Sequence, residues 1–371
     1  GISVDPENKT PEFKNLWLNG DVEIVRQSAN PANSFTATGN TLHATGRQVE
    51  DLEIKLFGDP AKFSSGARKL EGQRIDLAAE NRQLEIKVGG SGRIRFTTDK
   101  GFDKRKLAKE TDLDIFWSDH MVLHKRSAKF VGNIRVVMKV KPNADMEGTV
   151  AERRVTQDVE MTCAGMTVYF TKDIVLEKTG DDKTFDAIAA DGSDGTAKES
   201  PDIERIECHN TVKVSVKQWL DDELVGRHGA EFADLNVNMI TGDFNAIGRG
   251  FLESVSPDED GKMQGPAPAT ARANTPAQTS ENAFVYLRVE FIGDLTGNLD
   301  RGEANLTHNV MALVAPARHI DDQINMDVPT SELPERAGIL LSELLTISAI
   351  DRGSKSENSF EIVARDNARL R

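Results

Sequence analysis

The chain has 371 residues and a formal net charge of −14, from 60 acidic and 46 basic side chains. This field repels a nucleic-acid backbone, so no nucleic-acid partner is expected. The sequence holds no apolar stretch near the roughly 20 residues that an α-helix needs to cross a bilayer. The two cysteines, Cys163 and Cys208, are too few for a disulfide scaffold. They are interpreted either as small buried thiols or as one bridge between neighbouring strands, which only an oxidising compartment would allow.

Alternation of apolar and polar residues dominates the chain and predicts strands with one buried and one solvated face. The clearest examples, in chain order, are residues 52–56, 134–140, 212–217 and 285–291. In the last of these, Tyr286, Arg288 and Glu290 are assigned to the solvated face. Helical patterns are scarce. Residues 337–350 ("AGILLSELLTISAI") fit neither period and stay open between a short helix and a strand.

Short turns rich in Gly, Asn and Asp separate these strands. Examples are "ATGN" (37–40), "FVGN" (130–133), "ITGD" (240–243) and "LTGN" (295–298). Such turns mark hairpins or corners, and their frequency predicts an all-β fold. Two longer segments are expected to be loops or linkers: residues 179–201 are acidic and Gly-rich, and residues 255–281 are rich in Pro, Ala and Thr.

The turn spacing repeats along the chain although the residues do not. Residues 70–96 and 227–252 share a Gly, an apolar residue three positions later, a polar turn and a final Gly-x-apolar step. A repeat of this kind needs each unit only to present an apolar face inward and to stack on its neighbour. The pattern therefore predicts stacked β-units.

Several of these segments resemble a known family. They are "LWLNGDVEIVRQ" (16–27), "SFTATGNTLHATG" (34–46), "AKFVGNIRVV" (128–137), "IERIECHNTVKVSV" (203–216) and "SFEIVARDNARL" (359–370). All look like the OstA-like repeat, the β-jellyroll or "β-taco" module of lipopolysaccharide-transport proteins such as LptA-like periplasmic proteins. The family's Gly-Asn corner stands at Gly39-Asn40 and Gly132-Asn133, and is varied to His209-Asn210 and Asp366-Asn367. The resemblance spans roughly residues 14–254 and 284–371.

The resemblance implies an all-β, elongated stack of open antiparallel sheets. We expect a first unit at residues 1–100 and a second at 101–254, with a disordered acidic insertion at 179–201. A linker or loop at 255–281 would precede a third unit at 282–371, which we expect to stop within the repeat pattern. The two long loops depart from the single-unit members of the family.

In the family, an apolar groove shields acyl chains while sugar headgroups project into water. By alternation, the inward residues here are Val136, Met138, Val140, Val168, Phe170, Val212, Val214, Val216, Leu287, Val289 and Phe291. Burying an acyl chain is worth about 0.8 kcal/mol per CH₂, and these side chains can supply the surface. The same residues packed against each other as an ordinary core form the alternative.

The resemblance thus implies a non-enzymatic protein that binds or conducts a lipopolysaccharide-like glycolipid. We expect export to the periplasm or cell envelope, with the signal peptide outside this chain. Partners would be lipid or glycolipid, further copies added end to end, or other envelope proteins. The alternative function is a scaffold that polymerises into a fibre through edge-strand pairing. A carbohydrate-binding solenoid is disfavoured, because three Trp and two Tyr supply few sugar platforms.

No motif for catalysis, a cofactor or a metal is convincing in the sequence. His120 and His124 are four residues apart but lie in a strand-like context, without a third ligand nearby. Cys208 and His209 are adjacent on a strand and so point to opposite faces. The stretch "DGSDG" (191–195) is shorter than a calcium loop. Acidic pairs such as Asp321-Asp322 are interpreted as solubilising loop residues. We therefore expect neither an enzyme nor a bound metal.

Overall fold

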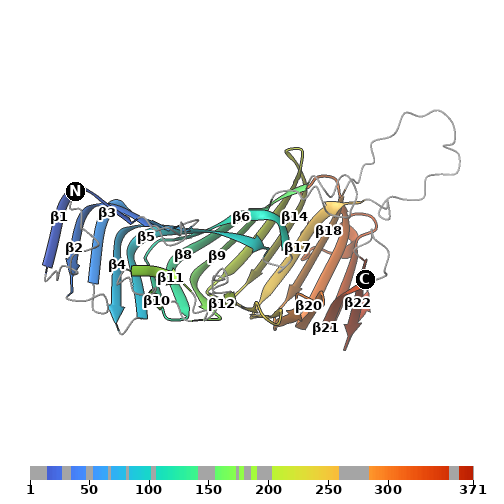
Figure 1. The fold of residues 1–371 in the computed structure, drawn as a ribbon. Coiled ribbons are helices and arrows are strands. Elements are labelled where there is room, and N and C mark those ends of the chain that lie inside the picture. Colours follow the sequence, from blue (N-terminus) through green and yellow to red (C-terminus); the bar gives the residue numbers. More distant parts are fainter. Residues whose placement is uncertain are drawn as a thin grey trace. The chain divides into compact units, whose positions relative to one another are not determined.

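The computed structural model (Figure 1) describes residues 15–26, 35–46, 53–65, 68–80, 83–101, 106–140, 155–172, 175–178, 185–189, 203–258, 284–350 and 359–370. Across these residues the chain is built of β-strands, with a single 3₁₀ turn at Thr330–Glu332. The strand pairs with a described register are antiparallel. The expectation of an all-β, antiparallel fold is confirmed. None of the described residues forms a helix long and apolar enough to span a membrane.

The N-terminal half contains twelve described strands. They are β1 (Asn15–Arg26), β2 (Phe35–Thr45), β3 (Glu53–Ser65), β4 (Arg68–Glu80), β5 (Gln83–Lys100), β6 (Lys106–Trp117), β7 (His120–His124), β8 (Ser127–Val140), β9 (Val155–Phe170), β10 (Val175–Lys178), β11 (Phe185–Ala189) and β12 (Ile203–His209). β11 lies within the segment 179–201 that was expected to be disordered, and it pairs with β10. The rest of that segment falls outside the described residues.

The C-terminal half continues in the same way. Its strands are β13 (Val212–Leu220), β14 (Glu223–Phe232), β15 (Asp234–Asn238), β16 (Asp243–Ile247), β17 (Gly250–Pro257), β18 (Phe284–Phe291), β19 (Leu295–Asn298), β20 (Glu303–Ala317), β21 (Gly338–Ile350), β22 (Ser359–Arg365) and β23 (Arg369–Leu370). Residues 337–350, left open between helix and strand, are therefore a strand. Of the expected linker 255–281, the first three residues belong to β17 and residues 259–281 lie outside the described part.

The chain divides into two compact units, each assembled from separate stretches. Unit 1 comprises residues 1–97, 112–136 and 163–208, and unit 2 comprises residues 98–111, 137–162 and 209–371. The long strands β5, β6, β8 and β9 contribute residues to both. The division into three successive OstA-like units stays a prediction.

In unit 1, strands β1 to β5 form a meander in which each pair of neighbouring strands is interrupted at the same level. The registers of β1–β2, β2–β3, β3–β4 and β4–β5 shift between Asn19 and Val22, Thr38 and Thr41, Phe57 and Ala61, and Gly72 and Arg74. Such bulges bend a strand, so the shifts mark a line of corners. A Cβ at Gly39 would lie 2.6 Å from the Phe57 carbonyl oxygen, which explains the glycine of that corner.

The other corners predicted from Gly-Asn and its variants adopt backbone conformations that Gly and Asn favour. Positive φ angles occur at Gly132 (82°), Asn133 (40°), Asn210 (62°) and Asn367 (61°). Left-handed φ costs little at Gly and is tolerated best by Asn and Asp among other residues. The motif thus marks a corner within β8 and the turns between β12 and β13 and between β22 and β23.

Unit 2 has two strand ladders, here called arms, which share β20 and β21. The first arm runs β9–β13–β14–β17–β18–β20–β21, and the second runs β15–β16–β19–β20–β21–β22. The N-terminal part of β20 pairs with β19, and the part after Asn309 pairs with β18. His308 and Asn309, with φ of 62° and 49°, form the corner between them.

The same corner explains why residues 337–350 fitted no single period. Opposite the bulge at His308 and Asn309, the register of β21 skips Glu343, whose N–H donates to the Asp366 carbonyl at 2.9 Å. On one face of β21, the register places the even-numbered Leu340 and Ser342 before this corner and the odd-numbered Leu345 and Ile347 beyond it, while the buried Ile339 lies on the opposite face. The alternation therefore shifts by one residue within the strand.

Side chains nearest the corners form the core. In unit 1, successive strands contribute Leu42, Leu56, Ile75, Val88, Met121 and Phe130 as register partners, each no more than 3% exposed. In unit 2, the second arm contributes Ala246, Leu295, Leu306 and Leu345 in the same way. The inner face of the second arm is the face that carries these four residues, and the inner face of the first arm is the face that carries the buried register partners Val212 and Phe232.

Unit 2 also buries part of its outer face, which the sequence did not predict. The segment Arg318–Ala337 packs Met326, Ile320, Ile324 and Leu333 against a cluster on β17, β18, β20 and β21 that includes Tyr286, Leu313 and Ala315. Tyr286, assigned to the solvated face from alternation, is 1% exposed. That assignment is wrong because the covering segment, called the cover below, excludes water from this face.

Candidate functional site

The eleven residues predicted to line a groove divide by burial. Those buried are Val136, Met138, Val168, Val212, Val289 and Phe291, and those half-buried are Val140, Phe170, Val214, Val216 and Leu287. In unit 2 the strand registers place Val212, Val214, Val216, Leu287, Val289 and Phe291 on the inner face of the first arm. Their neighbours Lys213, Ser215 and Lys217 are exposed on the outer face. For β13, alternation in the sequence thus separates the two faces of the strand.

Burial on this inner face falls with distance from the corner. The row closest to the corner is sealed, with Val212, Phe232 and Phe291 at 0%, 6% and 1% exposed. The row after it is mixed: Val289 and Ala312 are buried, and their register partners Val214, Ala230 and Leu252 are half-buried. The next row outward comprises Val216, His228, Ser254, Leu287 and Val314, one from each of β13, β14, β17, β18 and β20. All five are half-buried. This third row is called the margin row.

The second arm shows the same gradient. Its row closest to the corner includes Ala246 and Leu306, both 0% exposed. The next row outward comprises Val237, Phe244, Gly297, Ala304, Ile347 and Ile362 in register. The first five are half-buried, and Ile362 is 47% exposed. Both arms of unit 2 therefore carry an apolar inner face that is sealed at the corner and partly solvent-accessible beyond it.

His228 is the one titratable member of the margin row. Its Nδ1 lies 2.9 Å from the Ser254 Oγ, and its register partners on β13 and β17 are Val216 and Ser254. Burial lowers the pKa of His228, because the apolar surroundings disfavour the imidazolium. The side chain is therefore neutral at pH 7. It forms with Ser254 a small polar spot on an otherwise apolar row.

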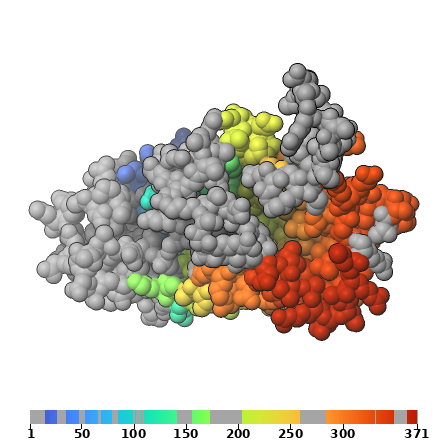
Figure 2. Space-filling model, turned by 90° about the vertical axis from the view of Figure 1, so that its right-hand side faces the viewer, coloured from blue at the N-terminus to red at the C-terminus, as the bar shows by residue number. Residues whose placement is uncertain are grey.

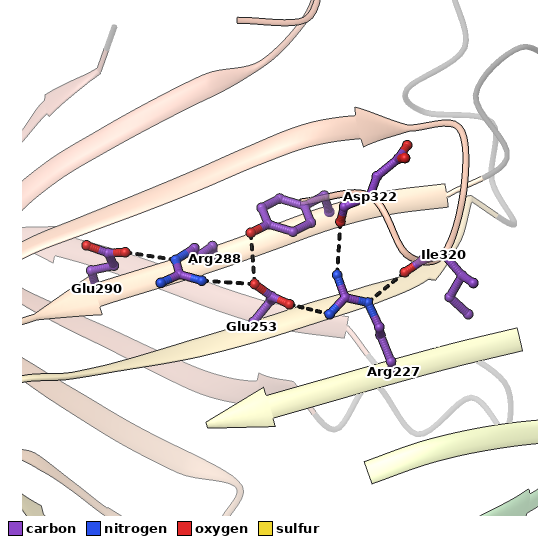
Figure 3. Close-up of polar contacts among 7 residues, drawn as sticks. Arg227, Glu253, Arg288, Glu290, Ile320 and Asp322 are labelled. Atoms are coloured by element: carbon purple, nitrogen blue, oxygen red, sulfur yellow. Dashed lines mark hydrogen bonds and ion pairs between the residues drawn. The ribbon is translucent and has the colours of Figure 1, made fainter. Parts of the chain in front are cut away.

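A cluster of charged and polar side chains lies on the outer face, next to the cover (Figure 3). Glu253 on β17 accepts from Arg227 at 2.5 Å, from Arg288 at 3.0 Å and from the Tyr286 hydroxyl at 2.9 Å. Its side chain is 9% exposed. Burial, followed by the hydrogen bond to the Glu253 carboxylate, raises the pKa of Tyr286 to about 12.

This cluster holds the cover onto the sheet. Arg227 donates from Nε to the Ile320 carbonyl at 2.6 Å and from Nη2 to the Asp322 carbonyl at 2.9 Å. The Asp322 carboxylate accepts from the backbone N–H groups of Arg318 and His319 at 2.8 and 2.9 Å, which lowers its pKa. Asp321 and Asp322 lie in the connection between β20 and β21, as expected, and Asp322 also shapes the turn that begins the cover.

The remaining sequence candidates do not form a site. His120 and His124 lie at the two ends of β7, and His120 contacts Asp119 at 3.1 Å. Within the described residues, no group of three His, Cys, Asp or Glu side chains is placed to hold a metal ion. The stretch 191–195 lies outside the described part of the chain.

A shallow polar hollow of about 290 Å³ is found on β16, β19 and β20. It is lined by Asp243, Phe244, Thr296, Gly297, Arg301, Glu303 and Asn305. Its charged groups have partners in the chain: Asp243 accepts from Asn298 at 2.6 Å, and Arg301 lies 3.5 Å from Glu303. Because these charged side chains are already paired within the chain, the hollow suggests no catalytic or binding role.

Comparison with known proteins finds no counterpart: no family model, no curated protein and no solved structure matches the chain. The OstA-like resemblance therefore rests on the sequence motifs alone.

Proposed function

We propose that the protein is a non-enzymatic component of the cell envelope that binds or conducts a lipopolysaccharide-like glycolipid along its apolar inner faces. The observation that carries the proposal is the difference in burial between the side chains on the two faces of one sheet. On β20, Leu313 and Ala315 point to the outer face and are 0% exposed beneath the cover. Val314, between them, points to the inner face and is half-buried.

The chemistry of the margin row suits an amphiphile. Val216, Leu287 and Val314 present apolar surface on which an acyl chain gains about 0.8 kcal/mol for each CH₂ it removes from water. His228 and Ser254 offer a hydrogen-bonding spot on the same row, where a headgroup or an ester carbonyl of the lipid would meet polar partners. A ligand of this kind would complete the burial that the chain leaves unfinished.

The corner motif supports the family part of the proposal. Asn133, Asn210 and Asn367 have positive φ, the conformation that a Gly-Asn corner favours, and this supports the proposal of a β-taco-like module. An envelope location and an exported chain are proposed on the same resemblance.

A scaffold is the second candidate, and one feature of unit 1 favours it. β1 lies at one end of the strand order in that unit (Figure 1), and it carries Trp17 and Val25, which are 58% and 54% exposed. The Trp17 ring stacks on His43 at 3.9 Å. In unit 2, β22 and β23 form part of the surface (red in Figure 2), with Leu370 79% exposed. Exposed apolar residues on such strands invite pairing with another chain.

Native mass spectrometry with lipid extraction, on protein purified from the cells that make it, tests the two candidates. The lipid proposal expects bound glycolipid at fixed stoichiometry. Val214→Glu places a charge on the half-buried inner face and should abolish lipid co-purification. Ser215→Glu, one residue away on the exposed outer face, is the matched control and should retain it. A lipid-free wild-type mass, with oligomers that persist on dilution, would replace the lipid proposal with the scaffold.

A further inference from the structure

The two cysteines of the chain, far apart in sequence, meet in the fold. Cys163 lies in β9 and Cys208 is the penultimate residue of β12, and these two strands pair. Both belong to unit 1. They are 5% and 0% exposed, so each thiol is enclosed by protein. The corner residues Asn210 and Thr211, both with positive φ, follow directly after β12.

Cys163 and Cys208 lie beside the same corner, because Cys163 follows Thr162, the register partner of Lys213, and Cys208 precedes Asn210 and Thr211. A hydrogen bond to Cys163, followed by burial and the charge that a Cys163 thiolate would carry, raises the pKa of the Cys208 thiol. β9 pairs with β12 on one side of this corner and with β13 on the other, so the corner brings the two cysteines of neighbouring strands together. In the structure the two cysteines are not joined.

We propose that Cys163 and Cys208 form an intramolecular disulfide when the chain folds in the presence of a thiol–disulfide oxidant. The two Sγ atoms lose their protons and form the S–S bond. The two electrons pass to the disulfide of the oxidant, which leaves as two thiols. No other cysteine competes, because the sequence contains only these two.

The reaction belongs to folding rather than to the finished protein. A buried thiol with a raised pKa supplies little thiolate, and the thiolate is the species that attacks a disulfide. Oxidation is therefore fast while the strands are still assembling and slow once β9 and β12 are packed. The same burial protects the bridge from reductants afterwards. The bond joins positions 163 and 208 and encloses the acidic segment between them, so it restrains the unfolded chain across 45 residues of sequence.

The inference does not depend on the lipid proposal. It uses a different part of the molecule, and it is read out without any ligand. A disulfide would be maintained in an oxidising compartment, whatever the inner faces bind.

The full chain, refolded with a mixture of oxidised and reduced glutathione or with reductant alone, provides the test. After oxidative refolding we expect a mass lower by the two lost hydrogens and one cross-linked peptide pair that contains both cysteines. We also expect a Tm higher by roughly 5–15 °C than that of the reduced chain. The reduced, folded chain should resist iodoacetamide until it is denatured.

The variant Cys163→Ala/Cys208→Ala should show a Tm that is independent of the redox buffer, which isolates the bridge from other oxidation. If this variant folds poorly, the mass of the unaltered chain after oxidative refolding still decides whether the bridge forms. Two alkylatable thiols after oxidative refolding, or glutathione adducts and disulfide-linked dimers in place of the internal bridge, would overturn the proposal.

Discussion

Removing the charge of Glu253 tests whether the outer-face cluster holds unit 2 together. Glu253→Gln keeps the size of the side chain but leaves Arg227 and Arg288 without their shared carboxylate, and the Tyr286 hydroxyl without a charged acceptor. Breaking a buried ion pair from one side costs about 3–5 kcal/mol. The arginine side chains are 21% and 24% exposed, so solvent screens part of this loss. We expect a decrease of about 2–3 kcal/mol in the free energy of unfolding of unit 2.

Urea denaturation, with hydrogen exchange followed on peptides, measures the effect. Faster exchange should concentrate in the cover, residues 318–337, because Arg227 also donates to the Ile320 and Asp322 carbonyls. Glu231→Gln on β14 is the matched control. Its partner Lys213 is at 3.2 Å, and the two side chains are 59% and 35% exposed, so the change should cost less than about 1 kcal/mol. Equal decreases in the free energy of unfolding of the two variants would refute the conclusion that Glu253 stabilises the contact between the cover and the sheet.

Three further predictions concern other features of unit 2. Leu313→Ala empties a 0% exposed position beneath the cover and should cost about 2–5 kcal/mol, whereas Ile362→Ala, at 47% exposed, should cost less than about 1 kcal/mol in the same thermal unfolding assay. Gly250→Ala places a Cβ against the Glu231 carbonyl and the Phe291 ring, and should destabilise by about 1–3 kcal/mol in urea titration. His228→Gln should lessen the loss of stability between pH 7 and pH 5: the pKa of His228 is lowered by burial, so below about pH 6.5 the unfolded chain takes up a proton that the folded chain does not. Parallel stability–pH curves for His228→Gln and the unaltered chain would contradict this.

The sequence predicted what depends on short-range pattern. Alternation in residues 212–217 correctly separated Val214 and Val216 from Lys213, Ser215 and Lys217, because the register of β13 is uninterrupted over these residues and water reaches its outer face. The Gly-Asn corners were predicted because left-handed φ is a property of single residues, as at Asn133. Local chemistry was sufficient in both cases.

What the sequence missed depends on contacts between distant segments. Tyr286 alternates like a solvated residue, yet it is buried by Met326, Ile324 and other residues of the cover, whose irregular spacing carries no period. The period of β21 is broken at Glu343 by a bulge on β20, which no pattern in residues 337–350 encodes. The approach of Cys163 to Cys208 likewise requires the pairing of β9 with β12.

The side chains of β20 allow burial on the two faces of unit 2 to be compared within one strand. Leu313 and Ala315 reach 0% exposure on the outer face because the cover supplies an apolar partner. Val314 and its register partner Leu287 lie on the inner face of the same strands and remain half-buried. A filled core would bring these two residues to the exposure of their neighbours, since dispersion and the hydrophobic effect favour full contact. The unfinished burial is therefore the feature that a bound acyl chain would complete. On this reasoning, ligand-loaded protein should protect the amides of β18 and β20 from exchange more than those of the cover.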